Sequence, residues 1–559
     1  MVCSWITLKN GFDIYESTIH PPEIGLYFLC CSFRTSDGKA AFVFPDGSER
    51  LPITVYSSDF TTPKWLKGGI IYQIFTDRFA KSENHSVSVK PGAILNPDWE
   101  NGVPEFAEKP GDPLKNNVFF GGSLYGIIEK LDYLQSLGVS TLYLNPIFEA
   151  ASNHKYDTGD YFSVDRMFGG EAALDKLISA LKKRGMRLIL DGVFNHTGDD
   201  SVYFNKYGRY TGLGAYQGKA SKYYEWYDFI CFPDNYSCWW GVKILPAINK
   251  QSESFRNFIC GEKGVIRHYL KKGVDGWRLD VADELSDEFL NALRKAAKTE
   301  KKDSVIIGEV WEDASVKIAY GLRRRYFQGS QLDSVMNYPL RNAIIDYLIS
   351  GDADKLSETA ISLYLHYPKC VSDVQMNLLG THDTERILNL LAQDGCTGMT
   401  NRQLSVHKMD PEARLRGREL LRLAAVLLYT LPGVPCIYYG DEVGTEGGRD
   451  PFNRKPFPWG HEDQGMLDWF RKLGKLRADL SELAEGKFSI LHSDDSLIAY
   501  RRGDLICAVN RGDTKVIVTS GPLQELLSGN ASIPGEDGMY RMSLGRDRAG
   551  IYKPVPIKT

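Results

Sequence analysis

One repeating sequence pattern constrains the fold of this 559-residue chain more than any other feature. From Gly68 onward, short apolar runs rich in β-branched residues alternate with helical patterns such as those at 174–183 and 289–297. The eight runs begin at Ile70, Thr141, Arg187, Val274, Val305, Asp333, Met376 and Pro435. Eight strand–helix units in succession predict an α/β fold, a (β/α)8 barrel. A doubly wound open sheet is the alternative, but no GxGxxG or Walker sequence follows any of the runs.

Different patterns flank and interrupt the barrel. Residues 1–63 alternate apolar and polar side chains and predict a short N-terminal β domain. The predicted barrel takes residues 64–478, with an insertion after its third strand at about 198–250 that is rich in Tyr, Trp and Gly. Strand-like patterns return near the end, so residues 479–559 predict a C-terminal antiparallel β-sandwich.

Charge and cysteine usage exclude several classes of protein. The net charge of −4 gives no basic field that would gather nucleic acid or anionic lipid. The ten cysteines are scattered without a CxxC pair, which indicates neither a disulfide framework nor a zinc site. The uncharged stretch 423–440 contains Pro432, Gly433 and Pro435, so a buried helix, a turn and a strand explain it better than a membrane span. No signal peptide is recognised at the N-terminus. We therefore expect a cytoplasmic protein with no nucleic-acid or membrane partner.

Acidic side chains end four of the predicted strands, at the edge where barrel enzymes carry their chemistry. A single aspartate at a strand end is more often a turn or helix cap. Four acids on one face, joined by an arginine and two histidines, are harder to explain by capping. The set consists of Asp191, His196, Arg278, Asp280, Glu309, His382 and Asp383.

Two of these acids suit a retaining glycosidase. Carboxylates on neighbouring strand ends can lie about 5 Å apart, which lets one act as nucleophile and the other as acid/base. Arg278 precedes Asp280 by two residues, so both side chains point to the same face of the strand. We expect the arginine to keep Asp280 ionised, as a nucleophile requires. Glu309 would hold the proton, which a dry pocket and a neighbouring carboxylate favour.

Four blocks, at residues 191–196, 276–284, 308–311 and 379–383, resemble in order and spacing the signature regions of the α-amylase family, glycoside hydrolase family 13. The resemblance covers about residues 20–520. It implies that Asp280 is the nucleophile, that Glu309 is the general acid/base, and that Asp383 binds the distorted sugar in the transition state.

The same resemblance implies further substrate-binding residues. Arg278 holds the nucleophile, His196 and His382 bind hydroxyls of the reacting sugar, and Asp191 supports the base of the site. Tyr156 is the implied stacking platform beneath that sugar. Asp450 and Arg454 resemble the pair that closes around the non-reducing end, with a plain surface ion pair as the alternative.

Within the family, the segments 245–249, 308–311 and 335–340 resemble the neopullulanase, cyclomaltodextrinase and maltogenic amylase group. That resemblance implies a retaining α-glucosidic hydrolase with an oligosaccharide substrate: short α-1,4-linked or α-1,6-linked maltosaccharides, cyclodextrins or pullulan. The reaction would pass through a covalent glycosyl-enzyme intermediate. A transglycosylase of the same family is one alternative. A non-catalytic carbohydrate-binding scaffold is another, but such chains lose triad acids and this one keeps all three.

Three departures from that group leave questions open. Residues 281–284 read Val-Ala-Asp-Glu where the group usually has Val-Ala-Asn-Glu, which leaves the bond preference open. The N-terminal domain is shorter than in the group, where it carries dimer contacts, so a homodimer is open too. No cofactor is required, but structural calcium is undecided: the loop at 80–86 has few oxygen donors at useful spacing. For Asn195 and Asp112, hydrogen bonding is favoured over calcium ligation.

Overall fold

The computed structural model describes residues 3–9, 12–30, 32–34, 38–42, 50–109 and 111–556. At its centre, eight parallel strands run in the spatial order β20-β17-β16-β13-β10-β7-β22-β21. They are β7 (Ile71–Ile74), β10 (Thr141–Leu144), β13 (Arg187–Gly192), β16 (Gly276–Leu279), β17 (Val305–Gly308), β20 (Ser334–Val335), β21 (Met376–Leu378) and β22 (Val434–Tyr438). A parallel bridge between Met336 and Met376 joins the two ends of the sheet. The predicted (β/α)8 barrel is confirmed, with a strand at each of the eight predicted runs.

Alternate residues of each strand face the inside of the barrel. Ile71, Tyr143 and Ile307 pack together in an interior cluster, whereas Leu142 and Trp277 pack outward against the helices. Because helices cover the outside, both faces of every strand are buried, which explains the continuous apolar runs in the sequence. The same alternation decides which side chains reach the mouth of the barrel.

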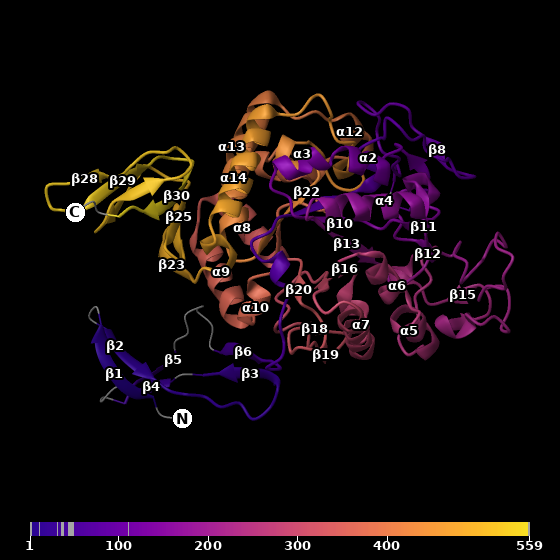
Figure 1. The fold of residues 1–559 in the computed structure, drawn as a ribbon, viewed down its shortest axis with the longest axis horizontal. Helices are drawn as coiled ribbons and strands as arrows, with labels where there is room; N and C mark the ends of the chain where they lie inside the picture. Colours follow the sequence, from indigo (N-terminus) through magenta and orange to yellow (C-terminus); the bar gives the residue numbers. More distant parts are fainter. Residues whose placement is uncertain are drawn as a thin grey trace.

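Helices surround the sheet on its outer face (Figure 1). They include α2 (Leu124–Glu129), α3 (Leu131–Ser136), α4 (Gly170–Lys183), α6 (Val265–Lys272), α7 (Asp287–Glu300), α8 (Tyr338–Ser350), α9 (Asp354–His366), α13 (Pro411–Thr430) and α14 (Gln464–Asp479). α13 begins at Asp410, whose carboxylate accepts hydrogen bonds from two backbone N–H groups of the first turn, with Pro411 at the first helical position. The uncharged stretch 423–440 forms the end of α13, a turn and β22, as expected. Among the described residues, no helix is long and apolar enough to cross a membrane.

The segment after β13 is the helix-poor insertion that its composition predicts. It holds only 3-10 turns and the short pair β14 (Phe229–Cys231) and β15 (Asn235–Tyr236) before α5 (Glu253–Cys260) begins. Many of its aromatic rings form its own core, such as Phe204, whose ring centroid lies 4.9 Å from that of Tyr227. Trp240 is different, because 81% of its surface is exposed.

Antiparallel strands flank the barrel at both ends of the chain (Figure 1). The N-terminal strands pair as β1 (Ser4–Lys9) with β2 (Phe12–Glu16), β3 (Gly25–Leu29) with β6 (Leu51–Val55), and β4 (Ser32–Arg34) with β5 (Ala40–Phe42). The C-terminal strands form two sheets: β23 (Phe488–Ser493), β24 (Leu497–Arg502), β25 (Leu505–Asn510), β30 (Arg548–Pro554) and β27 (Leu523–Glu525) in one, and β26 (Lys515–Thr519), β29 (Tyr540–Leu544) and β28 (Ile533–Pro534) in the other. Parts of the predicted N-terminal domain, and the last three residues, lie outside the described residues.

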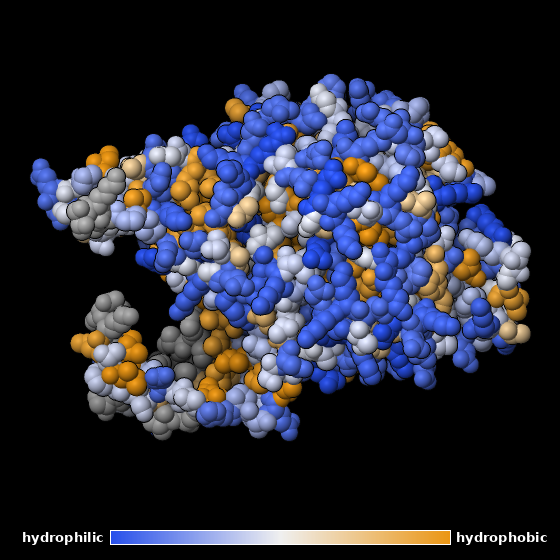
Figure 2. Space-filling model, in the orientation of Figure 1, coloured by the Kyte–Doolittle hydropathy of each residue, from blue (hydrophilic) through white to orange (hydrophobic). Residues whose placement is uncertain are grey.

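The two flanking regions differ in how they meet the barrel. The C-terminal sheet is joined to the helices, since Tyr347 of α8 donates a hydrogen bond to the carbonyl of Val509 at 2.7 Å. In the N-terminal region, β6 meets α9, where Oγ1 of Thr54 donates a hydrogen bond to the carbonyl of His366 at 3.2 Å, whereas β1 leaves the apolar side chains of Trp5 and Leu8 exposed. Figure 2 shows hydrophobic colour over the N-terminal strands, whereas the barrel side of that view is mostly hydrophilic.

Candidate active site at the barrel mouth

The period of two along each strand brings the predicted acids to the mouth of the barrel. Asp191, Asp280 and Glu309 each follow an inward-facing residue by two positions, so each side chain points into the mouth. The backbone hydrogen bonds between neighbouring strands continue to two of these acids. The N–H of Asp280 donates to the Gly192 carbonyl at 3.1 Å, and the N–H of Glu309 donates to the Leu279 carbonyl at 3.0 Å. Asp280 and Glu309 therefore lie side by side on adjacent strands.

A single buried guanidinium holds three of the acids. Nη1 of Arg278 lies 2.8 Å from Oδ1 of Asp191 and 2.9 Å from Oδ1 of Asp280. Nη2 lies 2.8 Å from Oε2 of Glu309. The arginine is completely buried, so these charge-assisted contacts are shielded from water. The sequence predicted the contact with Asp280 but not the other two.

Burial and neighbouring charges act in opposite directions on the acids of the cluster. Burial raises the pKa of Asp280 well above its ordinary value, the carboxylates of Glu309, Asp191 and Asp383 raise it further, and Arg278 only partly opposes them. Arg278 lies 2.9 Å from Asp280 and favours its ionised form, while burial and the neighbouring carboxylates act against it, so the ionisation of Asp280 stays a prediction. Burial also raises the pKa of Asp191 and of Asp383. These groups titrate as a coupled set in which acids outnumber cations, which favours keeping a proton.

Both oxygens of Glu309 have donors of their own. Oε2 accepts a hydrogen bond from the backbone N–H of Val281 at 2.8 Å, and Oε1 accepts one from the indole N–H of Trp311 at 3.0 Å. Val281 reaches this position with a φ of 39°, in the left-handed region that β-branched residues rarely adopt. Trp311 is fixed by stacking on Tyr338, with ring centroids 3.8 Å apart. The carboxyl group of Glu309 is thus held in one place.

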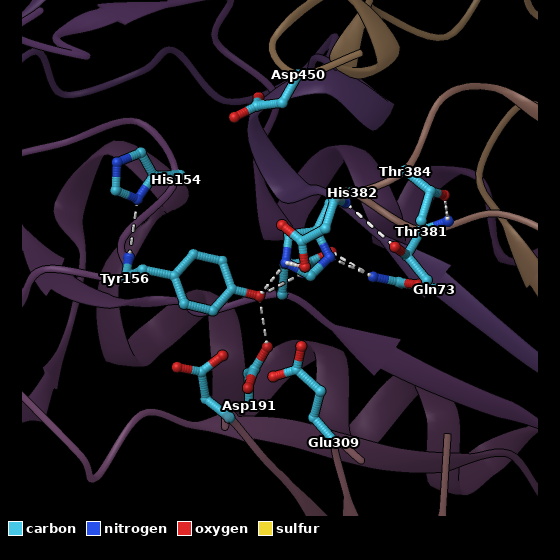
Figure 3. Close-up of polar contacts among 12 residues, drawn as sticks. Gln73, His154, Tyr156, Asp191, Glu309, Thr381, His382, Thr384 and Asp450 are labelled. Carbon is cyan, nitrogen blue, oxygen red and sulfur yellow. Dashed lines mark hydrogen bonds and ion pairs between the residues drawn. The ribbon is translucent and has the colours of Figure 1, made fainter. Parts of the chain in front are cut away.

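A chain of hydrogen bonds fixes Tyr156 and His382 above the acids (Figure 3). The amide nitrogen of Gln73 lies 3.0 Å from Nδ1 of His382, and Nε2 of that ring lies 2.6 Å from the Tyr156 hydroxyl. Burial lowers the pKa of His382 well below its usual range, so the ring is neutral. Because Gln73 donates to Nδ1, Nε2 carries the proton and donates to Tyr156. The Tyr156 hydroxyl in turn donates to Oδ2 of Asp191 at 2.9 Å.

His196 lies at the same mouth and is also neutral. Burial lowers its pKa to about 3, and the positive charge of Lys250 contributes. Its Nε2 lies 3.1 Å from the backbone carbonyl of Tyr156, and its ring centroid lies 5.3 Å from that of Trp239 in the insertion. His196 therefore connects the site to the aromatic residues of the insertion.

Asp450 and Arg454 belong to the site and are not an isolated surface pair. Nη1 of Arg454 lies 2.9 Å from Oδ1 of Asp450, and Nη2 lies 3.3 Å from Oδ1 of Asp383. Nε of the same arginine donates to the backbone carbonyl of His382 at 2.8 Å. In Figure 3, Asp450 faces the acids from the far side of the Tyr156–His382 pair. All ten predicted site residues are therefore joined in one network of contacts at the mouth of the barrel.

The family model of the α-amylase catalytic domain matches residues 73–476, well over half of the chain. This chain belongs to the α-amylase family. A cyclomaltodextrinase from a Bacillus species is 33% identical over 515 residues, which is 88% of this chain and 82% of that relative. An amylopullulanase from Thermoanaerobacterium saccharolyticum is 38% identical over 552 residues, 89% of this chain. The chain spans only 41% of the length of that amylopullulanase.

Among solved structures, the ligand-free cyclic α-maltosyl-(1→6)-maltose hydrolase from Arthrobacter globiformis is similar, with a TM-score of 0.71 and 30% identity. The match covers 89% of this chain and all of that one. The α-amylase family is thus shown by sequence and by fold.

Three polar residues of this α-amylase-family site were missed in the sequence. Tyr143 donates to Oδ2 of Asp191 at 2.7 Å, and Asn145 donates to the Tyr156 hydroxyl at 3.0 Å. Gln73 orients His382 through the contact with Nδ1. Tyr143 and Gln73 occupy inward positions of β10 and β7, and Asn145 directly follows β10. The strand period alone places Tyr143 and Gln73 on the inward face. An uncharged side chain there does not by itself indicate chemistry.

The contacts of Asn195 and Asp112 bear on whether either residue ligates calcium. Oδ1 of Asn195 accepts a hydrogen bond from the ammonium group of Lys250, so this oxygen is already facing a cation. Asp112 is exposed and accepts a hydrogen bond from the backbone N–H of Lys109 at 2.8 Å. Calcium needs six to eight oxygen ligands. The side chains at Asn195 do not fit a calcium site, and no step of the proposed mechanism involves a metal.

Proposed function

We propose that this member of the α-amylase family hydrolyses α-glucosidic bonds with retention of configuration. The observation that carries the proposal is the Arg278 guanidinium, whose two terminal nitrogens contact Asp280 and Glu309. Retaining enzymes need their two carboxyl groups about 5 Å apart, whereas inverting enzymes separate them by about 6.5–9.5 Å to admit a water. Two acids on one guanidinium fit the shorter separation.

The mechanism assigns one step to each acid. Glu309 donates its proton to the glycosidic oxygen while Asp280 attacks the anomeric carbon, so the bond to the leaving sugar breaks and a glycosyl ester forms. Glu309, now ionised, then takes a proton from water, and the resulting hydroxyl attacks the anomeric carbon and releases Asp280. Asp383 stabilises the positive charge that develops on the sugar ring.

The remaining residues position the reacting sugar. The Tyr156 ring provides a flat face for it, and the neutral rings of His196 and His382 can exchange hydrogen bonds with its hydroxyls. Asp450 and Arg454 close the non-reducing end. Asp191 touches the Tyr156 hydroxyl and Arg278, so it positions both and acts through them.

The proposed substrates are short maltosaccharides, cyclodextrins and pullulan. The relatives named cyclomaltodextrinase, amylopullulanase and cyclic α-maltosyl-(1→6)-maltose hydrolase support this class, including α-1,6 bonds. The test is product analysis on maltotriose, panose, pullulan and β-cyclodextrin side by side. Panose from pullulan is the expected result. Glucose as the sole product, released from the non-reducing end of every linear substrate, would contradict the proposal and indicate an exo-glucosidase.

Transglycosylation is a second candidate activity, favoured by the aromatic rings near Glu284. Trp240 donates its indole N–H to Glu284 at 3.1 Å, and burial together with this carboxylate raises the pKa of the Tyr320 hydroxyl to about 12. Trp240 stacks beside Trp239, which reaches His196. Exposed rings beside the site provide faces on which an acceptor sugar can stack. Products longer than the substrate at high maltose concentration would support this activity, and their absence would reject it.

Two further features remain proposals. A cytoplasmic location is supported by the buried cysteines Cys260, Cys396, Cys436 and Cys507, which are free thiols; cell fractionation tests it. A homodimer is supported by exposed apolar side chains on the N-terminal strands, such as Trp5 and Leu8. Sedimentation velocity tests the dimer, and a monomer at micromolar concentration would reject it.

A further inference from the structure

A thiol, an imidazole and a carboxylate converge outside the proposed catalytic machinery. Asp394 and Cys396 follow α11 (Ile387–Ala392), and His407 follows α12 (Asn401–Val406). An oxygen of Asp394, Sγ of Cys396 and a ring nitrogen of His407 all lie within 4.8 Å of one another. The proposed glycosidase mechanism uses none of these residues.

One amide orients two of the three groups. Nδ2 of Asn389 donates to Oδ2 of Asp394 at 2.8 Å and lies 3.6 Å from Sγ of Cys396. Oδ1 of Asn389 accepts a hydrogen bond from the backbone N–H of Gly447 at 2.7 Å, which fixes the amide itself. Outer partners that orient ligand atoms in this way are a regular feature of metal sites.

The charge balance around Asp394 also favours a cation. Its side chain is only 3% exposed, and its Oδ2 lies 2.9 Å from Nε2 of His407. Among the described residues, no lysine or arginine lies within ion-pair distance of this carboxylate. A second acid, Glu385, is near enough for the two carboxylates to repel each other. The side chains of Asn389 and His407 face this carboxylate, and a divalent ion between Asp394 and His407 would give it a fixed positive charge.

We propose that Asp394, Cys396 and His407 bind a zinc ion through three protein ligands, with the remaining position open to water. Thiolate, imidazole and carboxylate together are typical ligands of zinc, whereas calcium and magnesium prefer oxygen alone. Zinc-to-ligand bonds of about 2.0–2.3 Å place neighbouring ligand atoms about 3.3–3.6 Å apart. Small side-chain rotations therefore suffice to bring the three ligand atoms from within 4.8 Å of one another to these distances. Binding replaces the Asp394–His407 hydrogen bond and releases the Cys396 thiol proton to solvent.

The position of this zinc site predicts a structural role. An ion there would tie the end of α12 to the loop after α11. Asn401, at the start of α12, accepts a hydrogen bond from Nη2 of Arg449 at 2.7 Å, and Arg449 directly precedes Asp450. The zinc site would thus stabilise the wall that carries Asp450. A zinc ion would enter from solvent at His407, whose side chain is 19% exposed.

The test uses the full chain after dialysis against a chelator. Titration with Zn²⁺ in a calorimeter should show one tight equivalent, and the same equivalent should raise the Tm. Co²⁺ in its place should give a thiolate-to-cobalt charge-transfer band. Cys396→Ser should abolish the band, and His407→Gln, at a partly exposed position that should tolerate the change, should weaken Zn²⁺ binding at least tenfold.

Matched substitutions separate this site from stray binding at other thiols and imidazoles. Cys231→Ser removes an exposed cysteine, and His492→Gln removes another histidine beside an aspartate, so both should bind Zn²⁺ like the unmodified chain. No binding by the chelator-treated chain would overturn the proposal. Unchanged affinity in both Cys396→Ser and His407→Gln would also overturn it, since the zinc would then sit at adventitious sites only. Hydrolysis of maltotriose is not the readout, so failure here leaves the proposed function untouched.

Discussion

The two sides of the acid cluster differ in how firmly their side chains are held. On the reacting-sugar side, formed by Tyr156, His382 and Arg454, each side chain has at least two polar contacts and Arg454 is only 11% exposed. On the side of Glu284, which we propose as the leaving-group side, Trp240 is 81% exposed and Tyr320 is 74% exposed. Fixed polar groups recognise one sugar in one orientation, whereas exposed rings accept many. The difference suggests strict selection of the reacting glucose and tolerance toward its partner.

The largest effects should come from the acids between the two sides. Asp280→Asn should lower kcat/KM by about 10⁴-fold or more on every substrate, because no nucleophile remains. Glu309→Gln should lower kcat/KM on maltotriose by about 10²–10⁴-fold but have much less effect on an aryl α-maltoside whose leaving group needs no proton. Steady-state kinetics on both substrates measures this. Equal losses on the two substrates in Glu309→Gln would contradict the acid role, and circular dichroism checks that folding is kept.

A smaller effect is expected on the reacting-sugar side. Arg454→Met removes the cation that touches both Asp383 and Asp450, and should lower kcat/KM by about 10–100-fold, since a charge-assisted hydrogen bond contributes about 1.5–3 kcal/mol. The matched control is Arg402→Met, a side chain 75% exposed whose long contact with Glu108 is on the surface. If both variants keep full activity, the pair does not bind sugar.

Changes on the leaving-group side should alter product ratios more than rates. Trp240→Ala should change maltotriose hydrolysis by no more than about threefold, but should reduce products longer than the substrate several-fold, because it removes the exposed ring on which we propose that the acceptor stacks. Ile230→Ala, which also shortens an exposed side chain of the insertion, is the control. Chromatography of products at high maltose concentration decides. An unchanged transfer ratio would mean that Trp240 does not hold the acceptor.

Asp283, the residue that departs from the related group, allows a finer test of the same side. It accepts a hydrogen bond from the Tyr326 hydroxyl at 2.5 Å and lies 3.1 Å from Nζ of Lys317, at the base of the β18 (Ile318–Ala319) and β19 (Leu322–Arg323) hairpin that presents Tyr320. Asp283→Asn keeps an acceptor for Tyr326 and weakens the ion pair. The ratio of α-1,6 to α-1,4 cleavage on panose should then shift by a few-fold. An unchanged cleavage ratio would mean that Asp283 plays no part in bond preference.

The smallest effect is a pH dependence of stability. Burial lowers the pKa of Lys250 from 10.5 to about 8 in the folded chain. Between these values the unfolded chain binds more protons, so the free energy of unfolding should rise with pH, by no more than about 1.4 kcal/mol per pH unit. Urea unfolding below and above pH 8, for the unmodified chain and for Lys250→Met, measures the difference. An identical slope in both would contradict the assignment.

The sequence predicted the skeleton of this molecule well for a physical reason. Strands buried on both faces read as short apolar runs, and their period of two is enough to place Asp191, Arg278 and Asp280 on one face. The order of the strands around the barrel then follows from the fold class.

What the sequence could not supply were distances between segments far apart in the chain. That Arg278 is shared among three acids depends on the register of neighbouring strands, which no local pattern in the sequence reports. Gln73 and Asn145 were not predicted as site residues, because an uncharged residue at a strand end does not indicate a function until its contacts are known. The contact between Lys250 and Asn195 likewise joins two turns that no local pattern connects.

The central claim, a retaining displacement at Asp280, is tested most directly by the configuration of the first product. Proton NMR during rapid hydrolysis of a maltosaccharide, recorded before mutarotation, distinguishes the two anomers of the newly formed reducing end. Two carboxylates held side by side on Arg278 predict that the α-anomer appears first. If the β-anomer appears first, water attacks directly and the covalent intermediate at Asp280 does not exist.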